Sequence, residues 1–500
     1  MSIARPDAED PGYVPGERFA LRIERGPDAE IRLLVSGSSF QDAVRELRAA
    51  QARFITLFLA ETPAPALTAV FALRAELVLL QTAAAEEDPL AYREMGGWWP
   101  ATSYAERELL ERDRRVSAGR PLASRRLTEP DPDLIDRALS GLDVFTIPYG
   151  PVRSGVFEAV QFQIETGGED VPRLQTRLFF KHRGIEGRFA GLAPAVGVHV
   201  AERVAGIASC AYATAFSQAV ERAVGIEAPP RAQRWRAIHC ELERIACHLD
   251  VIAKEAETTA LYVGQARFQI LKERVQRLRA QLTGSRFGRG AIIPGGIRAD
   301  GAVPLDALGA ELADLERDLA HDRRLFVGTS SMTDRLIGGG QLSRALVEDY
   351  CAVGPVARGS GVSVDARHER PYGDYRRLGL QVVVHREGDA MARINVRFGE
   401  LSESLRLIRH ATEQLRRRDG EIHAPLPAAA TGAACGWVEA PQGELLFWVE
   451  IHDGLLQRVH IASPSLRNWA LFDHAFPKDV LTDFAFIEHS FGLTPAGADR

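Results

Sequence analysis

Residues 180–249 decide the fold of this chain and read FKHRGIEGRFAGLAPAVGVHVAERVAGIASCAYATAFSQAVERAVGIEAPPRAQRWRAIHCELERIACHL. The first part places apolar residues three and four positions apart, which is the spacing of a buried helix face. These residues are Val198, Val200, Val204, Ile207, Ala208, Ala211, Phe216, Val220 and Val224. Small residues crowd the middle of the pattern, so another helix or chain can approach it closely. A second long helical pattern follows the break at Ile226–Pro230.

The second helical pattern, over residues 231–257, carries charged side chains on one face. Glu241, Arg244 and His248 stand at helical spacing, and seven residues separate the first from the last. The apolar face consists of Leu242, Ile245 and Leu249. Such charges close a helix interface in many proteins, and in others they line a proton path through a bundle. The structural role is the simpler interpretation for each residue alone, and the sequence leaves both open.

The composition is that of a protein with two or three ordinary domains. The chain has 500 residues, 46% of them apolar, and a net charge of −6. The negative charge disfavours a broad surface for nucleic acid, so we expect no nucleic-acid partner. Five scattered cysteines without a C-x-x-C pair indicate free thiols in a reducing compartment. We expect neither a secretory leader nor a segment that spans a bilayer.

The first quarter of the chain indicates a disordered tail over residues 1–16 and a small α+β domain over residues 17–129. Alternating and apolar runs predict strands over Phe19–Ile23, Ile31–Val35, Phe54–Leu59, Leu67–Leu73 and Glu76–Gln81. Helices are predicted over Phe40–Ala50 and Tyr104–Arg114. An EPDPD run marks a linker over residues 130–145, and residues 146–500 form the large domain.

The large domain shows further periodic segments. A strand is predicted over Phe157–Glu165, and helices are predicted over Phe268–Leu282, Leu305–Arg323 and Val396–Gln414. Residues 436–451, GWVEAPQGELLFWVEI, predict a hairpin. The Gly-rich loop of residues 284–296 lacks G-K-[ST] and a strand-then-helix context, so it indicates no nucleotide site.

Three segments of the large domain resemble one superfamily. They are HRGIE at His182–Glu186, ERVAGIASCAYATAFSQAVE at Glu202–Glu221 and HCELERIACHL at His239–Leu249. The superfamily contains the D-type subunit of bacterial NADH-quinone oxidoreductase (complex I) and the large subunits of membrane-bound NiFe hydrogenases. The resemblance is strongest to the hydrogenase-4 and formate hydrogenlyase type. Residues Val353–Tyr375 and the Gly388-Asp389 element with Ala392-Arg393 match further signatures of the superfamily.

The small domain resembles a second component of the same complexes. Ala105–Leu127 is similar to the signature of the C-type subunit of complex I, although the family's D-x-F-G element is missing. The matching residues are Glu106, Arg107, Glu108, Gly119, Pro121, Arg125 and Arg126. Taken alone, the stretch is typical of a solvated helix with internal salt bridges. Fusion of C-type and D-type modules is the hydrogenlyase arrangement, so the order of the two domains supports the resemblance.

The resemblance implies that the metal ligands of the hydrogenases are lost here. Hydrogenases read R-V/I-C-G-I-C where this chain carries Ala205 and Ala208 at the two cysteine places. Near the end, the D-P-C-x-x-C-T-D-R element aligns Thr494 and Gly497 with the other two cysteines. Soft thiolate ligands hold the nickel and iron of that centre. We therefore expect no NiFe centre, and no hydrogen chemistry, in this chain.

The quinone partners of complex I are also absent from the aligned positions. Gly206 stands at the place of the tyrosine, and no histidine stands at its place near Arg153 or Ser154. Gln442 replaces an arginine that sits over the metal centre of the hydrogenases. The resemblance thus implies a degenerate cavity lined by Ala205, Gly206, Ala208, Gln442, Thr494 and Gly497.

The fold implied by the resemblance is α+β, with a small N-terminal α+β domain before a large, mainly helical bundle that carries short antiparallel hairpins. The implied function is that of a large subunit of an electron-transfer complex, with a role in assembly and in coupling redox chemistry to ion transport. The candidate proton-path residues are Glu186, Glu241, Arg244 and His248. An active oxidoreductase that uses quinone or another carrier in a reshaped pocket, and a non-catalytic scaffold, remain alternatives.

The resemblance also implies partners and a location. The partners are a small iron–sulfur subunit, a ferredoxin-like subunit and antiporter-like membrane subunits, with quinone as a possible small-molecule partner. The iron–sulfur clusters belong to the partner subunits, and this chain binds no cofactor of its own. The expected place is peripheral, on the cytoplasmic side of the inner membrane.

Overall fold

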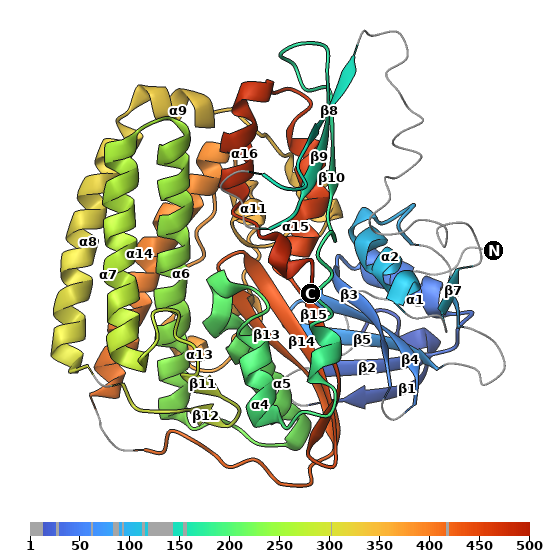
Figure 1. Ribbon diagram of the computed structural model, residues 1–500. Coiled ribbons are helices and arrows are strands. Elements are labelled where there is room, and N and C mark those ends of the chain that lie inside the picture. Colours follow the sequence, from blue (N-terminus) through green and yellow to red (C-terminus); the bar gives the residue numbers. More distant parts are fainter. Residues whose placement is uncertain are drawn as a thin grey trace. The chain divides into compact units, whose positions relative to one another are not determined.

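The computed structural model describes residues 14–26, 30–61, 64–83, 90–92, 95–112, 116–118, 144–153, 158–301, 303–416 and 420–500. The chain divides into two compact units, Met1–Arg126 and Leu127–Arg500 (Figure 1). The tail predicted over residues 1–16 and the linker predicted over residues 130–145 lie almost wholly outside the described residues.

The described part of the first unit is built on a five-stranded sheet. Its elements are β1 (Ala20–Arg25), β2 (Glu30–Val35), α1 (Phe40–Ala49), β3 (Arg53–Ala60), β4 (Ala66–Leu73), β5 (Glu76–Ala83), β6 (Leu90–Tyr92), α2 (Ser103–Arg112) and β7 (Val116–Ala118). The sheet order is β1-β2-β5-β4-β3, with β2 and β5 parallel. Helix α1 buries Phe40, Val44 and Leu47. The five strands and two helices predicted for this unit are confirmed.

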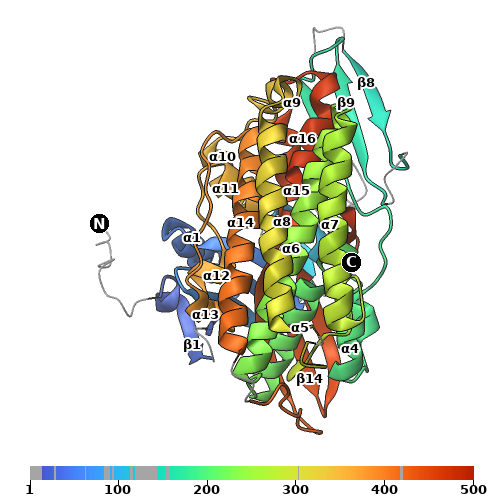
Figure 2. The same cartoon turned by 90° about the vertical axis from the view of Figure 1, so that its left-hand side faces the viewer.

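Four long helices of the second unit pack side by side (Figure 2). They are α6 (Pro230–Thr258), α7 (Tyr262–Thr283), α8 (Leu305–Val327) and α14 (Ala390–Leu415). The rings of Phe268, Phe326 and Phe398 come from α7, α8 and α14, and their centroids lie 5.6 to 6.1 Å apart. Helix α14 begins earlier than predicted because Asp389 Oδ1 accepts a hydrogen bond from Ala392 N at 2.7 Å. The predicted helical bundle is confirmed.

The prediction of one long helix up to residue 224 is wrong, because the chain leaves the helical path in the middle. It forms α4 (Pro194–Ala201) and α5 (Ser209–Val224) instead. Side chains from other segments hold the backbone between them. Buried Glu202 accepts a hydrogen bond from Gly290 N, and Arg183 Nη2 donates to Val204 O at 2.7 Å. Helical periodicity does not reveal these partners because they are distant in the sequence.

Helix α5 packs on a three-stranded antiparallel sheet of β13 (Gly432–Ala440), β14 (Gly443–His452) and β15 (Leu455–Ala462). The closest approach is at Gly436, where an added Cβ would lie 2.1 Å from Ala215 O and 2.5 Å from Ala219 N. Strand and helix therefore touch through their backbones, which the small residues of α5 allow. The contact lies at Ala215 and Ala219, just after the run of small residues for which a close approach was expected, and the hairpin predicted over residues 436–451 is present.

A second antiparallel sheet has the order β10-β9-β8. Its strands are β8 (Phe145–Tyr149), β9 (Gln161–Thr166) and β10 (Arg173–Arg177). Strand β9 begins later than predicted, and Phe157 lies outside the described residues. The ring of Phe162 packs against Trp469 and Phe472 of α15 (Pro464–Phe472) and against Phe484 of α16 (Phe484–Phe491). This aromatic cluster ties the sheet to the C-terminal helices.

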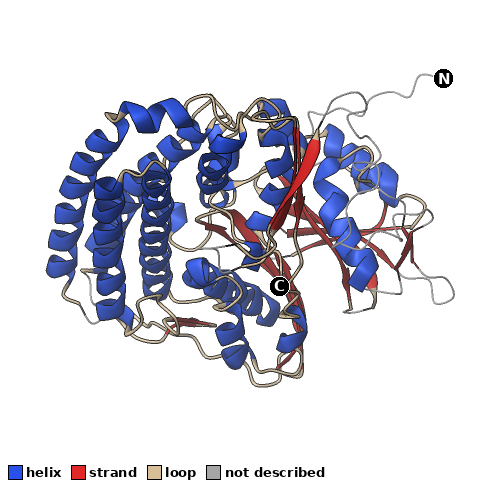
Figure 3. Ribbon diagram, turned by 45° about the horizontal axis from the view of Figure 1, so that its top comes forward, coloured by secondary structure: helices blue, strands red, loops and turns tan. Residues whose placement is uncertain are grey.

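Short elements complete the second unit. They are β11 (Ile292–Ile293), β12 (Gly296–Ile297), α9 (Ser330–Leu336), α10 (Arg344–Asp349), α11 (Gly354–Gly359), α12 (Ala366–Glu369) and α13 (Tyr375–Leu378). Figure 3 shows a mixture of long helices and antiparallel strands, in agreement with the predicted α+β class. Within the residues that are described, no helix is long and apolar enough to cross a bilayer.

Asp473, directly after α15, joins this helix to β10. Its Oδ1 accepts hydrogen bonds from Thr176 N at 2.8 Å and Thr176 Oγ1 at 2.6 Å. Burial raises the pKa of Asp473 to about 7, against the opposing effects of these hydrogen bonds and of Arg173. The folded-state pKa lies above the unfolded one. The carboxyl therefore stabilises the fold at low pH and loses this contribution as the pH rises through 7.

We expect Asp473→Asn to remove this pH dependence, since an amide oxygen can still accept both hydrogen bonds. The free energy of unfolding of the variant, relative to wild type, should increase by about 2 kcal/mol between about pH 5 and pH 8. The full shift of about three pKa units would give roughly 4 kcal/mol, but only the two units between pH 5 and 7 fall in this range, and the side chain keeps some contact with solvent. Urea titrations across this range would measure the change, with exposed Asp453→Asn as the control. Identical slopes for wild type and Asp473→Asn would contradict the prediction.

Candidate functional site

A stripe of charged and polar side chains runs through the interface of α6 and α14. It consists of Glu241, Arg244 and His248 from α6 and Arg397, Glu400 and Ser404 from α14, all of them buried. We call these six residues the α6–α14 stripe. The structure brings the three predicted residues of α6 together on one helix face, as their spacing required.

Glu241 accepts four hydrogen bonds inside the bundle. Its Oε1 accepts from Arg367 Nη1 at 2.9 Å and from Tyr375 Oη at 2.5 Å. Its Oε2 accepts from Ser404 Oγ at 2.6 Å and from Arg244 Nε at 3.2 Å. Burial alone would raise the pKa of Glu241, but the two arginines and the hydroxyl donors hold it at about 2. Glu241 is therefore ionised at neutral pH.

His248 lies between a carboxylate and a guanidinium group. Its Nε2 is 2.7 Å from Glu400 Oε2, and its Nδ1 is 3.2 Å from Arg397 Nη1. A guanidinium group can only donate, so Nδ1 accepts and the proton of the neutral ring sits on Nε2. Burial lowers the pKa of His248 to about 4, although Glu400 opposes this shift. A neutral imidazole that accepts at one nitrogen and donates from the other is suited to relay a proton.

Arg358 of α11 connects the stripe to β13. Its Nε donates to Glu400 Oε1 at 2.8 Å, and its Nη1 donates to Glu439 Oε1 at 2.8 Å. Asp365 lies 3.4 Å from the same Nη1 and also pairs with Arg367. Burial opposes the ionisation of Glu400, but Arg358 and His248 hold its pKa well below the usual range. Burial and the nearby Asp365 raise the pKa of Glu439. Opposite charges are thus closely paired in this buried network.

The partners of α6 from α14 and β13 were not predicted from the sequence. Glu400 and Glu439 lie far from Glu241 in the chain, and only the fold brings them to α6. One signal was available. Arg397, Glu400 and Ser404 are spaced three and four residues apart, as in a single face of a helix. Interpreting that spacing as a second charged face would have predicted the partner of α6.

Glu186 lies apart from the α6–α14 stripe. Its Oε1 accepts hydrogen bonds from Ile461 N at 2.9 Å and from Arg500 Nε at 2.8 Å. His460 Nδ1 lies 3.5 Å from the same oxygen. The structure therefore places this predicted residue between β15 and the C-terminal segment.

Arg183 joins the two loops that carry the expected cavity positions. Its Nη2 donates to Val204 O at 2.7 Å and to Ala496 O. The second loop is held further by Glu158, whose Oε2 accepts from Thr494 Oγ1 at 2.6 Å and from Ala496 N at 2.9 Å. The four positions aligned with metal ligands thus lie on two neighbouring loops.

The side chains on these loops do not fit a NiFe centre. Ala205 and Ala208 are buried and carry no donor atom, and Thr494 offers only a hydroxyl. A Cβ on Gly497 would lie 2.4 Å from Ser463 Oγ, so Ser463 fills the space that a longer side chain would need. Among the described residues, no group of three His, Cys, Asp or Glu side chains could hold a metal ion. A centre that requires four soft thiolates finds none here.

Cys210 is the thiol that follows the first loop, and its Sγ lies beside α7 and the loop after that helix. Its Sγ lies 3.4 Å from Arg279 Nη2, and its backbone N donates to Glu243 Oε2 at 2.8 Å. Burial, followed by the charge of Glu243, raises the pKa of this thiol well above its usual range. Cys210 is therefore a buried thiol that stays protonated at neutral pH.

The positions aligned with the quinone partners have different surroundings. Gly206 is exposed, and a Cβ there would lie 3.6 Å from Arg289 Nη2. Arg153 forms a bidentate ion pair with Glu488, at 2.6 and 2.9 Å. Gln442 Nε2 lies 3.2 Å from Cys247 Sγ and so turns toward α6. Ser154 lies outside the described residues.

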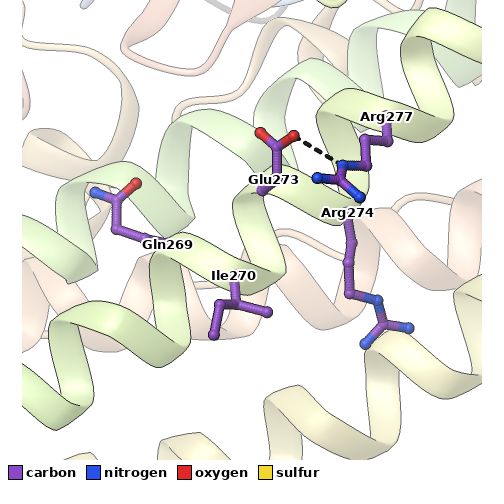
Figure 4. Close-up of a pocket in the computed structure, with 5 residues that line it drawn as sticks. All are labelled: Gln269, Ile270, Glu273, Arg274 and Arg277. Carbon is purple, nitrogen blue, oxygen red and sulfur yellow. Dashed lines mark hydrogen bonds and ion pairs between the residues drawn. The ribbon is translucent and has the colours of Figure 1, made fainter.

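A surface hollow lies on α7, separate from these groups (Figure 4). It is lined by Gln269, Ile270, Glu273, Arg274 and Arg277. Glu273 and Arg277 form an ion pair at 2.9 Å. Because all five side chains come from a single helix, the hollow contributes no residue to the candidate site.

Several known proteins have sequences that are similar to this chain. The family model of the 49 kDa subunit of respiratory-chain NADH dehydrogenase matches residues 256–430. The carbon monoxide-induced hydrogenase of Rhodospirillum rubrum is 31% identical over 362 residues, which cover 70% of this chain and 97% of the relative. Formate hydrogenlyase subunit 5 of Escherichia coli is 28% identical over 71% of this chain, and the match spans 63% of its own length.

The fold has a solved counterpart. A chain from the structure of the membrane-bound sulfane sulfur reductase, an archaeal respiratory membrane complex, aligns with a TM-score of 0.68 and 25% identity. The alignment covers 72% of this chain and 99% of that one. The chain therefore belongs to the family that unites the 49 kDa, or D-type, subunit of NADH-quinone oxidoreductase with subunits of membrane-bound hydrogenases.

Proposed function

We propose that this chain is the large subunit of a membrane-associated redox complex, in which it supports assembly and couples electron transfer to ion transport without holding a NiFe centre. One contrast within the second unit carries the proposal. Arg183 joins the two cavity loops, yet the described residues of these loops offer no metal ligand. In the α6–α14 stripe, in contrast, Glu241 pairs with Arg244, and Glu400 pairs with Arg244 and His248 and with Arg358 of α11.

The energetic cost of the stripe supports a role beyond packing. Removing an ion from water costs several kcal/mol even after the protein relaxes, and apolar side chains of similar volume often stabilise a fold as well or better. Clusters of buried ionisable groups are concentrated at functional sites for this reason. Glu241, Arg244 and His248 are therefore the candidates for carrying protons or transmitting strain, and Glu186 links the cavity loops to β15.

The proposed partners are a small iron–sulfur subunit, a ferredoxin-like subunit and antiporter-like membrane subunits, with the clusters held by the partners. The chain would lie at the periphery of the membrane, on its cytoplasmic side. Ile207 and Phe287 support a docking face beside the cavity, because each exposes 42% of its surface. The relative of known structure belongs to a respiratory membrane complex, which supports a multisubunit assembly.

A second candidate function is an active oxidoreductase that uses quinone or another carrier in a reshaped pocket. The exposed Gly206 favours it, because the guanidinium group of Arg289 and the apolar side chains of Ile207 and Phe287 lie around this position. An amphipathic head group could use one charged donor and an apolar rim. Saturable binding of a quinone analogue to the native complex, weakened by Gly206→Trp, would favour this function over the first.

Metal analysis of the purified native complex tests the proposal directly. We expect iron from the partner clusters and no nickel in proportion to this chain. Near-stoichiometric nickel would overturn the argument from ligands and restore a hydrogenase function. A complex without nickel would be consistent with both the coupling function and the quinone function. Binding of a quinone analogue would then distinguish between these two functions.

Substitutions in the stripe test the coupling role. We expect His248→Gln to keep a donor toward Glu400, because the amide can replace Nε2–H, but to lose the relay through the ring. Transport of protons per electron should fall by about half or more, with assembly retained. Glu241→Gln should reduce both the assembly of the complex and its transport of protons, because Arg244 and Arg367 each lose this carboxylate as a counter-charge.

Native gels and proton uptake by membrane vesicles would measure these effects, with exposed Glu257→Gln as the control on the same helix. If Glu241→Gln and His248→Gln leave both assembly and transport unchanged, the coupling role is wrong. Normal transport with impaired assembly would identify a purely structural scaffold.

A further inference from the structure

The charged face of α6 continues beyond the α6–α14 stripe to Glu255. This residue lies seven positions after His248 and fourteen after Glu241, so all three share one face of the helix. The distance from Glu241 to Glu255 along the helix is about 21 Å, at about 1.5 Å per residue. On α14 the series continues in the same direction from Arg397 to Arg393, one turn further. The two helices pack against each other.

Glu255 is fully buried, at 0% exposure, and neither of its carboxyl oxygens has a hydrogen-bond partner among the described residues. The two arginines opposite it are also incompletely bonded. Arg397 uses Nη1 and Nη2 on His248, Ser490 O and Phe491 O, and its Nε has no partner there. Arg393 uses Nε and Nη1, and its Nη2 likewise has no partner within the described part of the chain.

Buried polar atoms in folded proteins are almost always satisfied, either by the protein or by ordered water. Here two acceptor oxygens of Glu255 on α6 and two N–H donors, one each from Arg393 and Arg397 on the adjacent helix α14, have no partner among the described residues. A ligand that fits them must both donate and accept hydrogen bonds. A water molecule can both donate and accept hydrogen bonds and can exchange its protons. An apolar molecule can do neither, and an anion without a proton can only accept.

We propose that Glu255, Arg393 and Arg397 form a buried proton-binding site, in which water joins the carboxyl group to the two guanidinium groups and extends the α6–α14 stripe toward α16. The connection to the stripe is Arg397, which contacts His248 and lies one helix turn from Arg393 on α14. The connection toward α16 is Ser490, which accepts from Arg393 Nε at 2.9 Å.

The charge environment allows Glu255 to hold and to release a proton. Burial raises the pKa of Glu255 well above its usual range, and Arg393 and Arg397 of α14 oppose this effect. From α16, His489 approaches the same end of α6 by a 2.9 Å contact with Thr258 Oγ1. Lys272 of α7 forms an ion pair with Asp250 of α6 at 2.6 Å. Burial thus favours the neutral, protonated form of Glu255, while the two guanidinium groups of α14 favour the ionised form.

Infrared difference spectroscopy of the full chain at neutral pH tests the site. The spectrum of wild type minus Glu255→Gln should show the carbonyl band of one protonated carboxylic acid, because all other acids cancel. The band should shift in D₂O without unfolding, since bound water exchanges. The matched control, Glu257→Gln on the exposed side of α6, should show no such band. Glu255→Asp should retain a band at an altered position, which covers the case in which Glu255→Gln does not fold.

The absence of the band, or a band that shifts only on unfolding, would overturn the proposal. The role of the site in transport rests on the proposed coupling function. Measurements on the native complex distinguish a failure of the site from a failure of the coupling function. Glu255→Gln should lower protons moved per electron at least twofold while electron transfer continues. If the wild-type complex moves no protons but the band is present, the coupling function fails and the site stands. If transport is intact and the band is absent, the site alone fails.

Discussion

Replacement of Arg358 by methionine should lower the free energy of unfolding by about 3–5 kcal/mol, the cost of removing one partner of a buried ion pair. Arg358 is completely buried and bonds both Glu400 and Glu439, which lie on different elements. Methionine fills a similar volume, so the loss reports the unpaired carboxylates rather than a cavity. The effect is large because Glu439 would lose its ion pair with Arg358, and Glu400 would keep only His248 and the more distant Arg244 as partners of this kind.

Urea unfolding, followed by circular dichroism, would measure this change. Arg317→Met is the matched control, because Arg317 pairs with Asp314 on the surface of α8 and its side chain is 73% exposed. The control should change the stability by less than about 0.5 kcal/mol. A double variant in which Glu400→Gln is added should recover part of the loss. Equal effects of Arg358→Met and Arg317→Met would show that the network contributes no more than a surface ion pair.

Gly436→Ala should destabilise the second unit by roughly 3 kcal/mol or more, at the upper end of the cost of overpacking. The added methyl would lie 2.1 Å from Ala215 O and 2.5 Å from Ala219 N, and both are backbone atoms of α5. A backbone cannot rotate away as a flexible side chain can, so β13 and α5 would have to separate. Since β13 also carries Glu439, the separation should disturb the partner of Arg358 as well.

Gly309→Ala provides a control of opposite sign for the same chemical change. Gly309 lies inside α8, and an added Cβ there meets no atom of the described residues within 4 Å. Alanine has the higher helix propensity, so this variant should be more stable by about 0.5–1 kcal/mol. Thermal unfolding of both variants would measure the two effects. If Gly436→Ala unfolds at the wild-type temperature, helix and strand do not touch through their backbones.

The helical bundle and the charged face of α6 could be predicted from the sequence because both depend on local spacing. Glu241, Arg244 and His248 recur at helical intervals, and the apolar residues between them fix which face is buried. The strands of the small α+β unit follow in the same way, the first two from alternation and the other three from short apolar runs. In these segments local preference and tertiary packing agree, which is the usual condition for a reliable prediction.

The interruption between α4 and α5 could not be predicted, because Arg183 and Gly290 are the groups that hold the backbone there. The place of Glu186 also depends on contacts from distant segments, with Ile461 and Arg500. Glu255 could have been found from the sequence, since it continues the spacing of His248. Its role as a proton-binding group can be inferred only from the structure, in which Arg393 and Arg397 of α14 carry donors without partners among the described residues.

The contacts of Arg183 have a consequence for the order in which the protein folds. Arg183 and Ala496 are 313 positions apart in the chain, and Arg153 and Glu488 are 335 positions apart. Contacts between such distant segments form late, because the loop entropy must be lost before the contact is gained. The helices of the bundle are local by comparison. During synthesis the charged stripe can therefore assemble while the loops around Val204 and Ala496 are still apart, and the contacts of Arg183 with these loops form later.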